Sequence, residues 1–200
     1  TLTTGRPNVT DVFGFGRSED DVIRFAAALE SGSSHPLASA ILAKASERKI
    51  EPPRATGASA IGGKGVQGSF DGMELFLGSP RAAAERTSLT PEQKARVAAL
   101  NDDGKTVSLL VVDGSVAGVI AMRDEPRPDA KRGLKLLSDA GIRTIMLTGD
   151  NERTAAAIGK DLGIEVVAEL LPQDKQEIVS QLQKQRLVVA KVGDGINDAP

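Results

Sequence analysis

The period of the hydrophobic pattern changes near residue 121, and this change is the feature that most limits how the chain can fold. After it, segments with helical spacing alternate with short apolar runs. Helices are predicted at 127–140, 151–162 and 173–185, and strands at 143–147, around Val166 and at 187–192. Strands that alternate with helices indicate a parallel, doubly wound sheet. The pattern therefore predicts an α/β block over residues 121–200.

Residues 9–120 have a different pattern, in which helices are followed by closely spaced β-like runs. The predicted elements are helices at 19–31, 36–49 and 91–100, β-like runs separated by glycines between 51 and 78, and strands at 106–112 and 116–122. Asp113-Gly114, between the last two strands, is the strongest hairpin signal of the chain, and FDG at 70–72 predicts a second turn. We therefore predict an α+β block, entered by a loop at 1–8.

Composition excludes several kinds of site within these 200 residues. The chain has no cysteine and a single histidine, His35, so disulfides, thiolate metal sites and histidine clusters for zinc are excluded. A formal charge of −2 gives no reason to expect nucleic acid or an anionic membrane as a partner. The longest apolar stretch, at 116–122, is far shorter than the ~20 residues that span a bilayer. We expect the fragment to be soluble by itself, with any membrane spans outside it.

Two loops of the α/β block follow predicted strands, where open α/β sheets bind their ligands. They are LTGDN at 147–151 and VGDGIND at 192–198. Their glycines expose backbone N–H groups, which suit a phosphate. Asp194 and Asp198 would repel a phosphate alone, but they fit Mg²⁺, a hard cation that binds carboxylates, water and phosphate oxygens together. Lys175 is the candidate for balancing the remaining charge.

Each of these residues also has a simpler interpretation. Asp150 or Asn151 could cap the following helix. Asp194 and Asp198 could be turn residues, and Lys175 could be a solvated surface charge. Taken singly, each simpler interpretation is at least as good as the functional one. Their joint occurrence, in this order after strands, favours a site for phosphate and Mg²⁺.

Three motifs of the α/β block resemble, in order, the phosphorylation-domain motifs of P-type ATPases, within the haloacid dehalogenase-like superfamily. They are TGDN at 148–151, PQDK at 172–175 and GDGINDAP at 193–200. The opening TLTTG resembles the end of the family's DKTGTLT signature. The resemblance places the phosphorylated aspartate four residues before Thr1, outside the chain, so the fragment alone is expected to be inactive. It also implies that ATP and Mg²⁺ are bound.

The first block resembles the heavy-metal (P1B) branch of this family. SSHPL at 33–37 is similar to its SEHPL motif, with Ser34 where the family often has Glu. The resemblance implies that His35 positions ATP. The other nucleotide contacts that it implies are Glu30, Gly63, Gly65, Val66 and Gly78. His35 also directly precedes Pro36 at a predicted helix N-terminus, where free N–H groups favour anions, and the alternative is that it only caps this helix.

The resemblance implies an antiparallel-sheet nucleotide-binding domain at 9–120, inserted into a partial Rossmann-like phosphorylation domain at 1–8 and 121–200. GKGVQG at 63–68 also satisfies the dinucleotide pattern GxGxxG, but it leads into a predicted hairpin rather than a helix, so NAD binding is rejected. No Walker loop is present either, so ATP must be held in another way.

The implied reaction transfers the γ-phosphoryl group of ATP to the aspartate, and the aspartyl phosphate is later hydrolysed. Thr148 would contact the phosphoryl group, Asp150 would orient the neighbouring groups, and Lys175 would neutralise developing charge. Asp194 would hold Mg²⁺, with Asn197 and Asp198 shaping the loop.

The whole protein is expected to be a pump at the cytoplasmic face of a cell membrane, with transmembrane and actuator domains in the same polypeptide. RDEPR at 123–127 resembles the zinc, cadmium, lead or cobalt pumps more than the copper pumps. Two other classes stay open. One is a soluble phosphatase of the same superfamily, which has no reason to carry Glu30, His35 and Gly63 together. The other is a non-catalytic ATP-binding module.

Overall fold

The computed structural model describes residues 2–193, and the chain forms two compact units. One unit is the continuous segment Arg6–Glu125, and the other combines the chain up to Gly5 with the chain from Pro126 onward. The sequence predicted boundaries after residues 8 and 120, whereas the two units divide after Gly5 and after Glu125. The first unit is therefore inserted in the sequence of the second.

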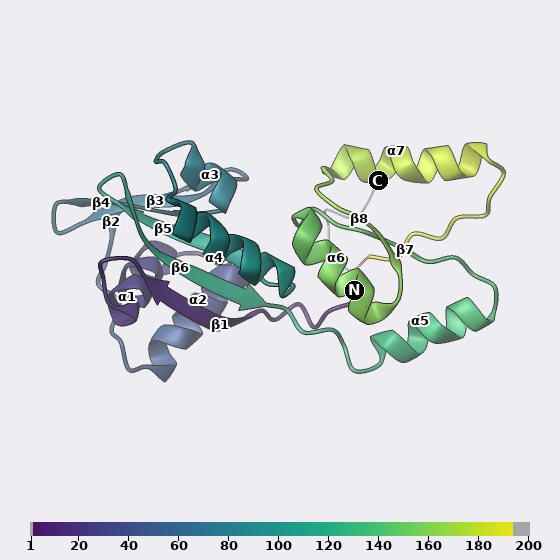
Figure 1. The fold of residues 1–200 in the computed structure, drawn as a ribbon, viewed down its shortest axis with the longest axis horizontal. Coiled ribbons are helices and arrows are strands. Elements are labelled where there is room, and N and C mark those ends of the chain that lie inside the picture. The colour runs from purple at the N-terminus through teal and green to yellow at the C-terminus, as the bar shows by residue number, and fades with distance from the viewer. Residues whose placement is uncertain (1, 194–200) are drawn as a thin grey trace. The chain divides into compact units, whose positions relative to one another are not determined.

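A six-stranded antiparallel sheet forms the centre of the unit Arg6–Glu125 (Figure 1). Its strands are β1 (Asn8–Gly14), β2 (Thr56–Ile61), β3 (Gly65–Phe70), β4 (Met73–Gly78), β5 (Thr106–Val112) and β6 (Ser115–Arg123). Their order across the sheet is β1-β6-β5-β4-β3-β2. The antiparallel sheet expected for this block is confirmed.

Helices cover both faces of this sheet. They are α1 (Glu19–Glu30), α2 (Pro36–Glu47), α3 (Pro80–Ala84) and α4 (Pro91–Asp102). Side chains of α1 and α2 pack with Leu77 and Ile120, whereas side chains of α3 and α4 pack with Phe76 and Val119. Because neighbouring residues of a strand point to opposite faces, the two helix pairs lie on opposite sides of the sheet.

Capping and turn residues explain why these elements begin and end where they do. The Ser18 hydroxyl accepts a hydrogen bond from the Asp21 N–H at 3.1 Å and starts α1 at the predicted residue. The β5–β6 turn has φ angles of 47° at Asp113 and 73° at Gly114. Positive values at both positions are those of the hairpin turn that Asp-Gly predicts, so this hairpin is confirmed.

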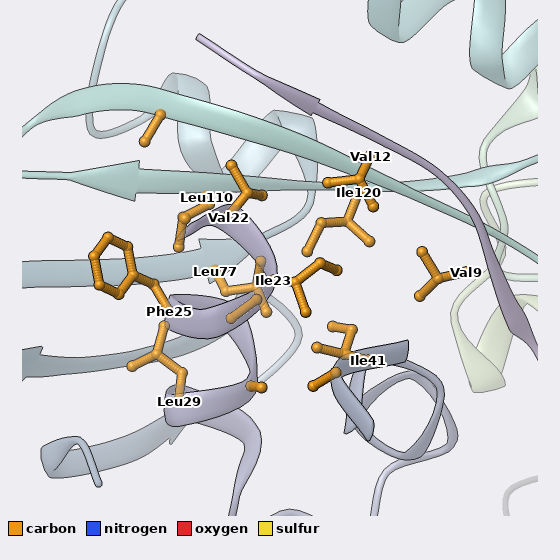
Figure 2. Close-up of a cluster of buried hydrophobic side chains, with 14 of the residues drawn as sticks. Val9, Val12, Val22, Ile23, Phe25, Leu29, Ile41, Leu77, Leu110 and Ile120 are labelled. Atoms are coloured by element: carbon orange, nitrogen blue, oxygen red, sulfur yellow. The ribbon is translucent and has the colours of Figure 1, made fainter. Parts of the chain in front are cut away.

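The core between α1, α2 and the sheet is built from aliphatic side chains and Phe25 (Figure 2). Val22 and Ile23 are completely buried, and each contributes roughly 1.5–3 kcal/mol by its removal from water. Helix α1 approaches β6 closely, because Gly118 lies directly beneath Val22. A Cβ atom at residue 118 would lie 2.7 Å from Cγ1 of Val22 and 2.8 Å from the carbonyl oxygen of Phe13.

The second unit alternates helices and strands, as predicted. Its elements are α5 (Ala130–Asp139), β7 (Ile145–Leu147), α6 (Glu152–Leu162), β8 (Glu165–Val167) and α7 (Pro172–Lys184). Strands β7 and β8 are parallel, with Leu147 opposite Val167. Their carboxyl ends therefore meet at one edge, which confirms the predicted placement of the loop after Leu147 at the end of a parallel strand.

One predicted element is absent from the described structure, and two elements of the structure were not predicted. The strand expected at 187–192 is wrong, because residues 187–193 form no regular element and none of the described strands pairs with them. An apolar run does not become a strand without a partner for its backbone groups. Strand β1 was missed because a bulge between Val9 and Asp11 breaks its alternation. Helix α3 was missed because five residues are too few to show a helical period.

Gly118→Ala should lower the free energy of unfolding of the first unit by about 1–3 kcal/mol, because the new methyl group would overlap Val22 and the strand backbone. Gly32→Ala is the matched control, since a Cβ atom at residue 32 would have nothing within 4 Å and the φ there is ordinary, and its effect should stay within about 0.5 kcal/mol. Urea unfolding followed by circular dichroism suits a chain without Trp or Tyr. Equal stability of the two variants would contradict the close packing of α1 on β6.

Candidate functional site

The Glu30 carboxylate, at the last residue of α1, is buried without a full set of partners. The side chain is 8% exposed, and among the described residues its Oε2 is the buried side-chain atom that has no hydrogen-bond partner. Burial raises the pKa of Glu30, while a hydrogen bond with Ser33 and the electrostatic influence of His35 act in the opposite direction. A buried acceptor without a donor costs free energy, so Glu30 is a candidate for contact with a bound ligand or water that supplies the donor.

The residues that follow α1 form a short loop that ends in the cap of α2. The Ser33 hydroxyl accepts a hydrogen bond from the His35 N–H at 3.2 Å, and Nδ1 of His35 accepts one from the Leu37 N–H at 3.2 Å. The capping role considered for His35 is therefore confirmed. Because Nδ1 accepts, the ring proton of the neutral imidazole is on Nε2. His35 is exposed, and the cap leaves Nε2 for another contact.

The glycine loop at 62–65 connects β2 and β3 and presses against the end of β4. Gly63 has a φ of +68° and Gly65 a φ of +149°. Gly65 pairs with Gly78, and a Cβ atom at residue 65 would lie 2.7 Å from the Gly78 Cα. The loop is fixed there by a hydrogen bond of 3.3 Å from the Ser79 N–H to the Lys64 carbonyl. Close backbone contact thus requires glycine at residues 65 and 78, whereas at residue 63 glycine is favoured by the positive φ alone.

Val66 and Glu30 belong to the same side of the sheet. Val66 packs against the cluster that contains Leu29, the neighbour of Glu30. A Cβ atom at Gly68 would lie 3.1 Å from Cδ2 of Leu29, so the end of α1 rests directly on β3. The structure therefore brings the end of α1, which carries Glu30, and the start of β3, which carries Val66, to one face. In the sequence, Gly68 was noted only as part of the rejected dinucleotide pattern. Nothing in the sequence indicated that α1 packs against it.

In the second unit, hydrogen bonds connect the loop after β7 to the loop after β8. The Thr148 hydroxyl donates to Oδ2 of Asp150 at 2.8 Å and accepts from the Asp150 N–H at 3.1 Å. The carbonyl of Thr148 accepts from the Leu170 N–H at 3.0 Å, and that of Asp150 from the Glu169 N–H at 2.9 Å. Thr148 and Asp150 are therefore held as one group at the carboxyl edge of the parallel strands.

Helix α7 begins directly after this loop and carries Lys175 in its first turn. Asp174 caps the helix, because its Oδ2 accepts a hydrogen bond from the Leu171 N–H at 2.7 Å. In α6 the arrangement is reversed, because Asn151 is itself the N-cap residue and its Oδ1 accepts from the Thr154 N–H at 3.0 Å, so the cap interpretation of Asn151 is confirmed. The first turn of α7, which carries Lys175, thus directly follows the loop whose N–H groups are hydrogen-bonded to the carbonyls of Thr148 and Asp150.

The predicted Mg²⁺ residues Asp194 and Asp198, with Asn197, lie outside the described residues, and their roles stay predictions. Within residues 2–193, no group of three or more His, Cys, Asp or Glu side chains is arranged to hold a metal ion. No helix in the same range is long and apolar enough to cross a membrane.

Comparisons with known proteins agree with these motifs. A family model of haloacid dehalogenase-like hydrolases matches residues 1–200. The chain is 44% identical over 202 residues to a copper-transporting P-type ATPase of Rhizobium leguminosarum bv. viciae, which covers all of this chain and 24% of that protein. It is 41% identical over 205 residues to a zinc-exporting P-type ATPase of Mycobacterium marinum, which covers all of this chain and 28% of that protein. The chain spans about a quarter of the length of these relatives.

A solved structure supports the same similarity. It is the catalytic domain of the CPx-ATPase CopB-B, described for its conformational changes upon nucleotide binding. The TM-score is 0.69 at 28% identity, and the match covers 99% of this chain and 69% of that chain.

Glu30→Gln should change how stability depends on pH. Because the pKa of Glu30 is raised, the native state holds this proton more tightly than the unfolded chain, and wild-type stability falls as pH rises from about 4.5 through the raised value. The advantage of Glu30→Gln over wild type should grow through this window and then level off. Urea unfolding at a series of pH values measures it, with the exposed Glu51→Gln as control. Parallel curves for wild type and Glu30→Gln would contradict the burial of an ionised carboxylate.

Proposed function

From the premise that the chain belongs to the haloacid dehalogenase-like hydrolases, as a catalytic region of the heavy-metal (P1B) P-type ATPases, we propose that it binds ATP and serves phosphoryl transfer in a metal-exporting pump. The observation that carries the nucleotide half of this proposal is the unpaired Oε2 of Glu30, buried at the end of the helix that packs on β3. An adenine amine is a donor of the kind that this acceptor lacks.

The nucleotide would be held by the first unit. Glu30 would accept from the base, and His35 would use Nε2 while Nδ1 caps α2. The residues that would line the remainder of the site are Gly63, Gly65, Val66 and Gly78. The pairing of Gly65 with Gly78 fixes this loop by backbone contact between β3 and β4. Support for the site comes from Gly63, where the Cβ position faces open space and the backbone can be approached closely by a ligand.

Phosphoryl transfer would be served by the second unit. The carboxylate of an aspartate outside the chain would attack the γ-phosphorus, ADP would leave, and water would later hydrolyse the aspartyl phosphate. Thr148 would contact the phosphoryl group, Asp150 would orient Thr148, and Lys175 would neutralise developing charge. Asp194 and Asp198 would hold Mg²⁺. The hydrogen bond between Thr148 and Asp150 supports the pairing of their roles.

The whole protein would couple this chemistry to export of a heavy-metal cation through transmembrane and actuator domains, with this region on the cytoplasmic side. Relatives that transport copper and a relative that exports zinc both match along the full chain. Residues 123–127 favour zinc, cadmium, lead or cobalt, and copper is the alternative. A soluble phosphatase would share the loop at 148–151, but it gives no reason for the buried carboxylate of Glu30.

His35→Asn and His35→Ala together separate capping from nucleotide contact. Asparagine caps helices well, so His35→Asn should keep wild-type stability, whereas His35→Ala should lose about 1 kcal/mol. Both variants should bind ATP about tenfold or more weakly, because both lack the imidazole that contacts the ligand. Calorimetric ATP titration and urea unfolding of the three proteins measure this. Wild-type affinity in His35→Asn would reduce His35 to a capping residue, and absence of ATP binding by wild type would contradict the proposed nucleotide site.

Asp194→Asn in the complete pump should lower phosphoenzyme formation from ATP by at least about 100-fold, because the Mg²⁺ that screens the phosphates would lose a ligand. Removing Mg²⁺ with a chelator should have the same effect on wild type. Asp139→Asn is the matched control, since Asp139 is an exposed helix residue paired with Lys135. Labelling with γ-phosphate-labelled ATP, with Zn²⁺ or Cu⁺ supplied in turn, measures the intermediate and identifies the cation. Normal labelling of Asp194→Asn would contradict the assignment.

A further inference from the structure

Helix α3 is connected at its N-terminal end to the glycine loop. The Ser79 hydroxyl caps α3 by accepting from the Ala82 N–H at 3.2 Å. The N–H of the same Ser79 donates to the Lys64 carbonyl, at 3.3 Å, within the loop at 62–65. The residue that starts α3 therefore also holds the main chain of the loop.

The C-terminal end of α3 is connected to the same region. Glu85, the C-cap residue, forms an ion pair with the Lys64 ammonium. Arg86 donates from Nη2 to Oε1 of Gln67 at 2.9 Å, and its guanidinium lies 4.1 Å from the centre of the Phe76 ring. Lys64 is thus held by α3 at both its carbonyl and its side chain, and β3 is held three residues further on.

These contacts lie on the side of the sheet opposite to Val66 and to the end of α1 that carries Glu30. Gln67 is paired with Phe76, and Val66 with Leu77, in the β3–β4 register. Phe76 belongs to the cluster of α3 and α4, whereas Leu77 and Val66 belong to that of α1 and α2. The contacts of Arg86 therefore support β3 from behind, and they do not occupy the face that carries Val66.

We infer that residues 79–86, the α3 brace, fix the glycine loop in the conformation that receives the nucleotide, with Glu85 and Arg86 as positioning residues. This inference rests on the proposed ATP site. A loop with glycines at positive φ has many alternative conformations, and holding it before binding removes part of the entropic cost of ordering it around a ligand. The hydrogen bond with Lys64, helped by the charges of Arg81 and Arg86, lowers the pKa of Glu85 and keeps it ionised.

The test compares Glu85→Gln, Lys64→Met and the double variant with wild type in the 200-residue chain. Each should bind ATP about threefold more weakly, as expected for loss of one exposed ion pair, and the double variant should be no weaker than either single variant. Backbone amides of residues 62–66 should exchange hydrogen faster in all three, while the midpoint of urea unfolding falls only slightly, as for the loss of any exposed ion pair. Lys64→Arg, which keeps the pair, should behave as wild type.

Glu47→Gln is the control, because it breaks another exposed ion pair of the same unit, with Lys44 at 3.0 Å on α2. It should change neither ATP affinity nor exchange in the loop. Wild-type exchange rates in Glu85→Gln would overturn the α3 brace, and tighter ATP binding by that variant would do so too, since it would mean that Glu85 withholds Lys64 from the phosphates. If wild type does not bind ATP, the proposed function fails, and the exchange rates still decide whether α3 fixes the loop.

Discussion

The packing of α1 on two glycines of the sheet determines where the Glu30 carboxylate lies. Val22 rests on Gly118 of β6, and two turns later Leu29 rests on Gly68 of β3. A helix seated at both ends on bare backbone cannot roll or slide without opening the core, because protein interiors are close-packed. The residue after Leu29 is therefore fixed beside β3, and its carboxylate is buried although Oε2 has no hydrogen-bond partner. Packing buries this group, and the hydrogen bond with Ser33 still leaves Oε2 without a partner.

The second unit positions its polar residues in a different way, through the backbone. Leu147 and Val167 lie side by side at the ends of parallel strands, and each strand is only three residues long. Such short strands define an edge poorly, so the loops beyond them continue the pairing with main-chain hydrogen bonds from Glu169 and Leu170. Gly149 fits into this arrangement because a Cβ there would already touch the Leu170 carbonyl, at 3.3 Å. The geometry of Thr148 and Asp150 thus depends on neighbouring backbone rather than on a large core.

The sequence was sufficient where one local signal decides the structure. Ser18 and Asp113-Gly114 are such signals, and the elements that they predict are confirmed, because caps and tight turns depend on a few adjacent residues. The sequence was insufficient where a structure depends on a partner that is distant along the chain. The apolar residues 187–192 are an example, because none of the described strands pairs with them. For the candidate site, motifs supplied Glu30 and His35, but not the burial of Glu30, which depends on a sheet contact 38 residues away at Gly68. Helix α3 was not predicted because it is too short to show a helical period, and because its contacts with the glycine loop are distant in the sequence.

Burial of Glu30 has a consequence for which ligands the first unit can accept. A solvated carboxylate would lose little when a ligand offers it no donor, because water replaces the missing hydrogen bond. The Oε2 of Glu30 is buried from bulk solvent, so a ligand that places another acceptor against it brings two buried lone pairs to face each other. Rejection of the wrong base by a buried polar group is usually stronger than attraction of the right one. Within the proposed function, the same packing that destabilises the free chain would therefore provide preference for a base that presents an amine over one that presents a carbonyl.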